Sequence, residues 1–153
     1  MLLPEDEPFM RLAIDASARA LEEGNGPFGA SLSKAGSLIH VARNNQNTRG
    51  DLTGHAEVVL VREVVELHGK PILQGATVYA SGEPCAMCCG AMFWAGITRV
   101  VYAATQADII DALGGPRLPI ASANVFAGAH PQVAIDGPLL RDDAIKVLRR
   151  AIH

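Results

Sequence analysis

The chain has 153 residues, of which 49% are hydrophobic and 19% are charged. This composition excludes a charge-rich disordered chain, and the length leaves no room for a second ordinary domain. The formal net charge of −3 gives no overall positive potential that would attract a phosphate backbone. It therefore favours a small-molecule substrate over a nucleic acid. We expect one compact domain over residues 1–153.

The N-terminal sequence and the lengths of the apolar runs predict a cytoplasmic protein without a membrane span. Residues 5–7 are acidic, where a secretory signal has basic residues followed by an apolar run. Elsewhere the apolar runs are interrupted after a few residues, whereas a helix that crosses a bilayer needs ~20.

In chain order, the apolar and turn residues predict alternating helices and strands. Helical spacing over 8–23 ends at a Gly-Asn-Gly-Pro turn, and two short apolar runs, 29–33 and 38–42, predict a hairpin. A polar loop over 44–54 precedes a valine-rich run in which interspersed charged residues favour a helix over a strand. The remaining predicted elements are a strand over 76–80, a helix over 85–95, a strand over 99–103, a short helix over 106–113, a strand over 133–135 and a terminal helix after 136–138.

This order, αββαβαβαβα, predicts a three-layer α/β/α sandwich. Strands that alternate with helices pair in parallel, because each connecting helix returns the chain to the starting edge of the sheet. We therefore expect a central, mostly parallel, five-stranded mixed sheet. Residues 105–130 are the least regular part, with a loop broken by Gly and Pro after the short helix.

Two predicted helix starts carry the residues that suit a metal ion. In Pro84-Cys85-Ala86-Met87-Cys88, two thiols three residues apart lie on one face of the first helical turn, where the helix N-terminus favours thiolates. Alone, a Cys-x-x-Cys pair also suits redox chemistry. His55 adds an imidazole at the start of the preceding helix. Three protein ligands leave a fourth position for water, the pattern of catalytic zinc, so we expect one Zn²⁺ per chain.

Glu57, two residues after His55, is expected to carry protons in the reaction. Zinc lowers the pKa of its bound water toward ~7 and so supplies hydroxide at neutral pH. Replacing a ring amino group with oxygen also requires protons on the ring nitrogen and on the leaving group, which a positioned carboxylate can deliver. His-x-Glu followed by Pro-Cys-x-x-Cys is the signature of zinc-dependent nucleobase deaminases, so the sequence predicts hydrolytic deamination.

From Pro27-Phe28-Gly29-Ala30 through both metal motifs to the terminal helix, the chain resembles the cytidine deaminase superfamily. The run from Gly82 to Ala95 is most similar to the guanine deaminase branch, which carries a tryptophan at the position of Trp94. The tRNA adenosine deaminase branch is similar over the same run and usually lacks that tryptophan. The resemblance implies guanine as the first substrate, xanthine and ammonia as products, and a homodimer.

The resemblance also implies which residues bind the substrate. In both branches the first asparagine of the loop before His-Ala-Glu binds the ring, and by position that residue is Asn44. Its amide offers a donor and an acceptor side by side. Trp94 and Phe28 are candidates for stacking on the ring, although such residues more often belong to the core. Ala56 is a further candidate contact.

One departure from the family pattern leaves the substrate open. Guanine deaminases of this type use a further acidic residue from the segment after the fourth strand or from the C-terminus, and the nearby acids, Asp108 and Asp111, do not match cleanly. Adenosine in tRNA, a free nucleoside, cytosine and an aminotriazine are therefore alternative substrates. A structural zinc ion that stabilises the fold without taking part in catalysis is a third hypothesis. It would need a fourth protein ligand, and only Cys89 is near enough, with poor geometry.

Overall fold

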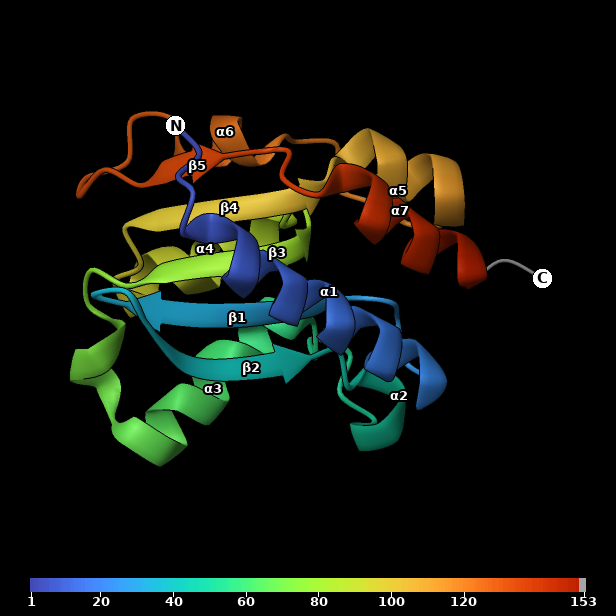
Figure 1. Cartoon of the computed structure of the whole chain (residues 1–153), viewed down its shortest axis with the longest axis horizontal. Coiled ribbons are helices and arrows are strands. Elements are labelled where there is room, and N and C mark those ends of the chain that lie inside the picture. Colours follow the sequence, from blue (N-terminus) through green and yellow to red (C-terminus); the bar gives the residue numbers. More distant parts are fainter. Residues whose placement is uncertain (152–153) are drawn as a thin grey trace.

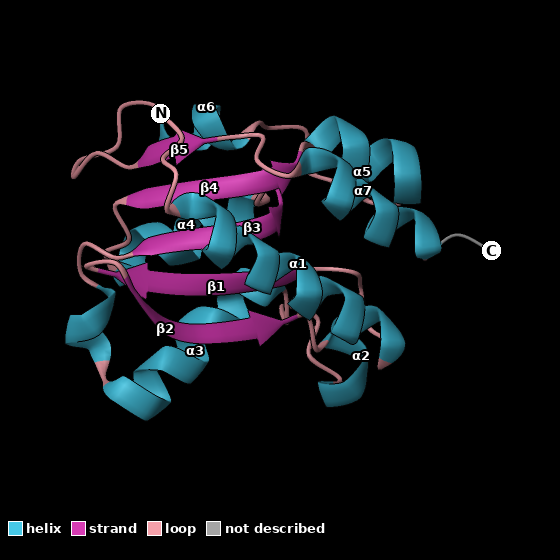
Figure 2. Ribbon diagram, in the orientation of Figure 1, coloured by secondary structure: helices cyan, strands magenta, loops and turns pink. Residues whose placement is uncertain are grey.

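The computed structural model describes residues 1–151 as a five-stranded sheet with helices on both faces (Figures 1 and 2). The strands are β1 (Gly29–Lys34), β2 (Ser37–Arg43), β3 (Thr77–Gly82), β4 (Arg99–Ala104) and β5 (Ala134–Asp136). Their order in the sheet is β2-β1-β3-β4-β5. β1 pairs antiparallel with both of its neighbours, whereas β3, β4 and β5 pair in parallel. The sheet is mixed, as predicted, but parallel pairing is confined to one half of it.

The helices form the two outer layers, which confirms the predicted sandwich. They are α1 (Asp6–Glu22), α2 (Gln46–Arg49), α3 (Ala56–His68), the 3₁₀ helix η1 (Lys70–Leu73), α4 (Ala86–Ala95), α5 (Gln106–Leu113), α6 (Ser122–Phe126) and α7 (Arg141–Arg150). In Figure 1, α1 crosses the near face of the sheet, with α5 and α7 at one end, while α3 and α4 lie behind it. Within residues 1–151, no helix is both long and apolar enough to cross a membrane.

The two faces of the sheet bury separate apolar clusters. One packs α3 and α4 against the sheet, and the other packs α1 and α7 against the opposite face. The valine-rich α3 is a helix because its apolar residues follow helical spacing: Leu60 and Val64 are fully buried, whereas Arg62 and Glu66 are exposed. Burial of this stripe outweighs the low helix propensity of valine.

The structure differs from the sequence prediction mainly in the connecting segments. The polar loop predicted over 44–54 contains the short helix α2, and the irregular segment 105–130 contains α6. At α2, the side-chain oxygen of Asn25 accepts hydrogen bonds from the backbone N–H groups of Asn47 and Thr48, at 2.9 and 3.1 Å. Such partners lie far away in the sequence, so no local pattern predicts these helices.

A buried ion pair fastens the start of α1 to the sheet. Asp6 is fully buried, and its carboxylate accepts hydrogen bonds from both terminal nitrogens of Arg99 at 2.7 and 2.8 Å. The Tyr79 hydroxyl and the Leu3 backbone N–H donate to the same carboxylate. Burial by itself raises the pKa of Asp6, but these donors outweigh it and hold that pKa below its usual range. Arg99 also donates to Asp136 of β5, at 3.1 Å.

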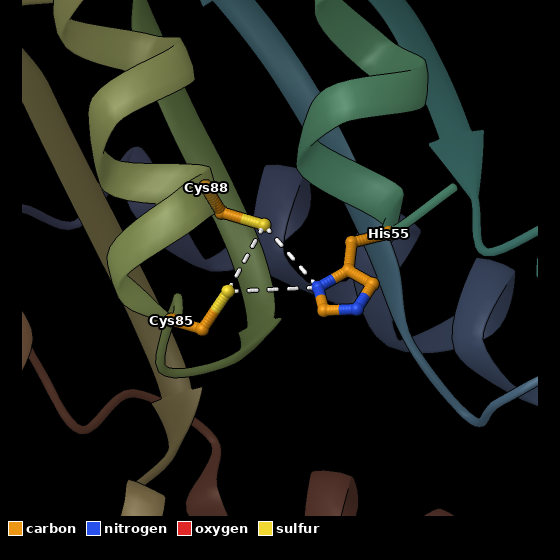
Figure 3. A group of neighbouring side chains, drawn as sticks. All are labelled: His55, Cys85 and Cys88. Atoms are coloured by element: carbon orange, nitrogen blue, oxygen red, sulfur yellow. Dashed lines mark hydrogen bonds between the residues drawn. The ribbon is translucent and has the colours of Figure 1, made fainter. Parts of the chain in front are cut away.

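The carboxyl ends of the parallel strands position the site. β3 ends at Gly82, and the chain enters α4 a few residues later, so α4 begins at that edge of the sheet. α3 packs beside α4, and its first residues lie against the first turn of α4 (Figure 3). Ligands of α/β sheets bind outside the carboxyl ends of the strands.

Candidate active site

Three potential metal ligands meet where α3 and α4 begin (Figure 3). His55 is the capping residue before α3, and Cys85 holds the same position before α4, one turn ahead of Cys88. The two sulfur atoms lie 3.6 Å apart. Nδ1 of His55 lies 3.6 Å from the sulfur of Cys85 and 3.5 Å from that of Cys88. The structure thus brings together the three ligands that the sequence predicted.

These distances fit a tetrahedral zinc site. Zn–S bonds of about 2.3 Å and Zn–N bonds of about 2.0–2.1 Å, at tetrahedral angles, separate two sulfurs by about 3.8 Å and a sulfur from a nitrogen by about 3.6 Å. Hydrogen bonds from Cys88 and His55 outweigh burial and lower the pKa of the Cys85 thiol to about 4, so a thiolate is available at neutral pH. Three ligands leave one coordination position open.

Glu57 lies in the first turn of α3, and only 5% of its surface is exposed. Burial raises the pKa of its carboxyl to about 7, although a hydrogen bond with Cys88 acts in the opposite direction. A carboxyl with a pKa near neutrality can both accept and donate a proton. Glu57 borders the same cavity as His55 and Cys85.

A cavity of about 250 Å³ opens in front of these residues. Asn44 and Phe28, both predicted from the sequence, line it. Its wall combines a few polar groups with an apolar side formed by Phe28, Ile109, Ile110, Leu113, Pro116 and Leu118. A concave, largely apolar cavity with a few placed polar groups is typical of a small-molecule site.

The wall formed by Phe28 depends on Gly82 at the end of β3. A Cβ atom at position 82 would lie 2.9 Å from the Phe28 ring and 2.9 Å from Ile109. Any side chain there would push two cavity walls apart. The half-buried Phe28 ring therefore serves both as a wall of the cavity and as part of the packing around it.

Hydrogen bonds with Glu83 and Gln106 fix both ends of the stretch that leads to α6. Part of this stretch, within residues 114–121, borders the cavity. The Glu83 carboxylate accepts hydrogen bonds from the backbone N–H of Gln106 at 3.0 Å, and from the N–H and hydroxyl of Ser122 at 3.0 and 2.7 Å. The Gln106 side chain donates to the Ile120 carbonyl at 3.0 Å. The sequence does not indicate these residues, because the partners of Glu83 lie more than twenty positions away, beyond any local pattern.

Trp94 and Ala56 do not line the cavity of this chain. Trp94 lies near the end of α4 with 84% of its surface exposed, and it contacts the Phe93 ring edge-on, with ring centroids 5.0 Å apart. Ala56 is fully buried in the core between α3 and the sheet. The expected stacking of Trp94 on the ring does not occur within one chain, because α4 turns this position to the surface.

The acids considered for substrate binding also lie outside the cavity. Asp108 accepts a hydrogen bond from the Thr105 N–H and pairs with two nitrogens of Arg141 at 2.7 and 2.8 Å. The Arg141 guanidinium holds the pKa of Asp108 well below its usual range. Asp111 is exposed. Among the described residues, the acids that line the cavity are Glu57 and Glu83.

Comparison with known proteins places this site in a family. Residues 3–104 match the family model described as the cytidine and deoxycytidylate deaminase zinc-binding region. The chain belongs to this deaminase family. It is therefore a zinc-type hydrolytic deaminase, and His55, Cys85 and Cys88 are the residues that fit the zinc ion.

The relatives of this deaminase act on different rings. A probable cytosine deaminase of Schizosaccharomyces pombe is 32% identical over 148 residues, which cover 94% of this chain and 90% of that protein. The guanine deaminase of Bacillus subtilis is 38% identical over 107 residues, 69% of each chain. The tRNA-specific adenosine deaminase of the same organism is 36% identical over 102 residues, 67% of this chain and 63% of that one. Among solved structures, a guanine deaminase from Nitrosomonas europaea superposes with a TM-score of 0.81 at 25% identity, covering 99% of this chain and 85% of that one.

Proposed function

We propose that this deaminase acts on a free nucleobase, with guanine as the first substrate and xanthine and ammonia as the products. In this hydrolysis the oxygen of water bonds to the ring carbon and the exocyclic C–N bond breaks. The amine leaves as ammonia after taking up one proton from that water, and the other proton of the water ends on a ring nitrogen of the product. The observation that carries the proposal is a cavity of about 250 Å³ whose wall includes two of the three zinc-fitting residues, His55 and Cys85, together with Glu57 and Asn44.

Two residues have assigned roles in this reaction. Glu57 accepts a proton from the attacking water and delivers it to the leaving amine, a task for which a pKa of about 7 is suited. Asn44 binds the edge of the ring through its amide. Zinc, when bound by His55, Cys85 and Cys88, supplies Lewis-acid activation of the water.

The distribution of charge supports a free base over a nucleic acid. Arg141, which begins the basic C-terminal helix, is paired with Asp108. Other arginines that pair with carboxylates are Arg11, Arg43, Arg62, Arg99 and Arg150. This pairing, together with a net charge of −3, gives the chain no excess of positive charge to attract a phosphate backbone.

A substrate panel with a salt titration tests the proposal. Ammonia release is measured from guanine, guanosine, adenosine, cytosine, cytidine, aminotriazines and an adenosine anticodon stem-loop. We expect release from guanine that stays nearly constant between low and moderate salt, because a neutral base displaces no counterions. No release from guanine, with inosine formed in the stem-loop and lost as salt rises, would overturn the proposal.

Deamination of adenosine in tRNA is the second candidate function. The similarity to the tRNA-specific adenosine deaminase of Bacillus subtilis favours it. Its substrate base would have to be flipped out of the stack into the cavity. The anticodon stem-loop in the same panel separates this candidate from the first.

We also propose that the deaminase forms a homodimer through the outer side of α4. Trp94 is 84% exposed, and large exposed aromatic side chains are typical of interfaces. Phe93 extends the same surface, whereas the neighbouring Met92 is fully buried and takes no part in it. Light scattering should give twice the 16.1 kDa chain mass for the wild type and the single mass for Trp94→Lys. A monomeric wild type would contradict the proposal.

A further inference from the structure

Gln46, the first residue of α2, makes two hydrogen bonds to the side chain of Asn44 and a third to the backbone of Leu52. Its side-chain oxygen accepts from Nδ2 of Asn44 at 2.8 Å, and its backbone N–H donates to Oδ1 of Asn44 at 3.0 Å. Its own side-chain nitrogen donates to the carbonyl of Leu52 at 2.9 Å. Gln46 itself lines the cavity.

These bonds determine which way the amide of Asn44 faces. The three hydrogen bonds form a chain that runs from the Leu52 carbonyl through the side-chain amides of Gln46 and Asn44 to the backbone N–H of Gln46. The carbonyl at one end can only accept, and the N–H at the other end can only donate. Turning the amide of Gln46 over would set its oxygen against the Leu52 carbonyl. Turning the amide of Asn44 over would set its nitrogen against the Gln46 N–H and its oxygen against the Gln46 oxygen. One orientation of each amide therefore satisfies every partner.

Asn44 has little freedom to find other partners. Only 2% of its surface is exposed, and a Cβ atom at Gly26 would lie 3.2 Å from its Nδ2. The bonds to Gln46 occupy one hydrogen of the Asn44 amide and one lone pair of its oxygen. The other hydrogen and the other lone pair are left for a ring. The order of donor and acceptor that the ring meets is thus set by Gln46.

We propose that Gln46 is a positioning residue, which fixes the amide of Asn44 in the orientation that binds the substrate ring. This inference rests on the proposed role of Asn44 in binding a ring. It does not depend on which ring is deaminated. Gln46→Met keeps an unbranched side chain of similar length and removes both polar atoms, while the backbone bond to Asn44 remains.

A double-mutant cycle tests the inference in the zinc-loaded protein. Asn44→Ala, Gln46→Met and the double variant are compared with the wild type on the ring that the wild type deaminates. We expect Gln46→Met to raise KM about tenfold with a smaller change in kcat, because loss of a binding interaction appears in KM. In the Asn44→Ala background the same substitution should change KM less than about twofold. An equal rise in both backgrounds would overturn the inference.

A matched control and a second readout separate positioning from loop stability. Asn47→Ala removes another side-chain bond of α2, to the Gly24 carbonyl, and should leave KM unchanged. Side-chain amide NMR needs no turnover: the Asn44 amide should give two well-separated, slowly exchanging protons in the wild type and lose that separation in Gln46→Met. Unchanged Asn44 amide signals in Gln46→Met would contradict the inference, whether or not guanine is the substrate.

Discussion

Replacing Glu83 with glutamine tests whether the segment bordering the cavity is held as the structure indicates. Hydrogen bonds to a charged group contribute about 1.5–3 kcal/mol each. Of the three bonds that Glu83 accepts, from Gln106 and Ser122, glutamine loses one, because its amide nitrogen opposes an N–H donor. The other two lose their charge assistance. Because the donors are only partly buried and water can replace the lost bond, we expect a cost of about 2 kcal/mol, or about 4–8 °C in Tm for a domain of this size.

Thermal unfolding and steady-state kinetics together check this prediction. Because Pro116 and Leu118 line the cavity from the held segment, loosening of that segment should raise KM several-fold. Asp111→Asn is the control, since Asp111 is an exposed acid of neighbouring α5 that does not line the cavity. A Glu83→Gln variant with the Tm and KM of the wild type would refute the structural role of Glu83.

Two further substitutions test the metal centre and the fold. Cys88→Ala should abolish stoichiometric zinc binding, because two protein ligands remain; full zinc retention on metal analysis would contradict the ligand set. Asp6→Asn should lower the free energy of unfolding at neutral pH by about 3 kcal/mol, since it breaks a buried pair with Arg99. The pKa of Asp6 is lowered in the folded state, so its contribution is present above about pH 3.8 and is lost as pH falls further. Denaturant unfolding should therefore show the difference between wild type and variant shrinking in acid, and a difference that grows in acid would exclude this role.

Much of the fold was predictable because its signals are local. The helix over 106–113 matches α5 in both bounds, and the ends of the predicted strands differ from the observed ones by at most two residues. The antiparallel pairing of β1 with β3 was not predictable, because it depends on how the hairpin docks beside a strand more than forty residues away. Alternation of strands and helices favours parallel pairing and carries no information about the first hairpin.

In the site, as in the fold, the residues with a local sequence signal were the predictable ones. His55, Cys85 and Cys88 were predictable because each stands at a helix start with a spacing that zinc requires. Glu83 was not, because its partners lie more than twenty positions away and only the tertiary structure brings them near. Gln46 was not, because its bonds to Asn44 and Leu52 depend on the conformation of the loop, which residue spacing does not specify. Trp94 was expected at the ring from resemblance alone, and within one chain it lies outside the cavity with 84% of its surface exposed.

The most direct test of the central claim is the amount of ammonia and xanthine formed from guanine by zinc-loaded wild type and zinc-loaded Glu57→Gln. Glutamine has nearly the shape of the buried glutamate and cannot transfer a proton at neutral pH. We predict equal amounts of ammonia and xanthine from the wild type, and turnover lower by about 10²–10⁴-fold in the variant at equal zinc content. Wild-type turnover in Glu57→Gln, or no ammonia from guanine while another ring of the panel is deaminated, would contradict the claim.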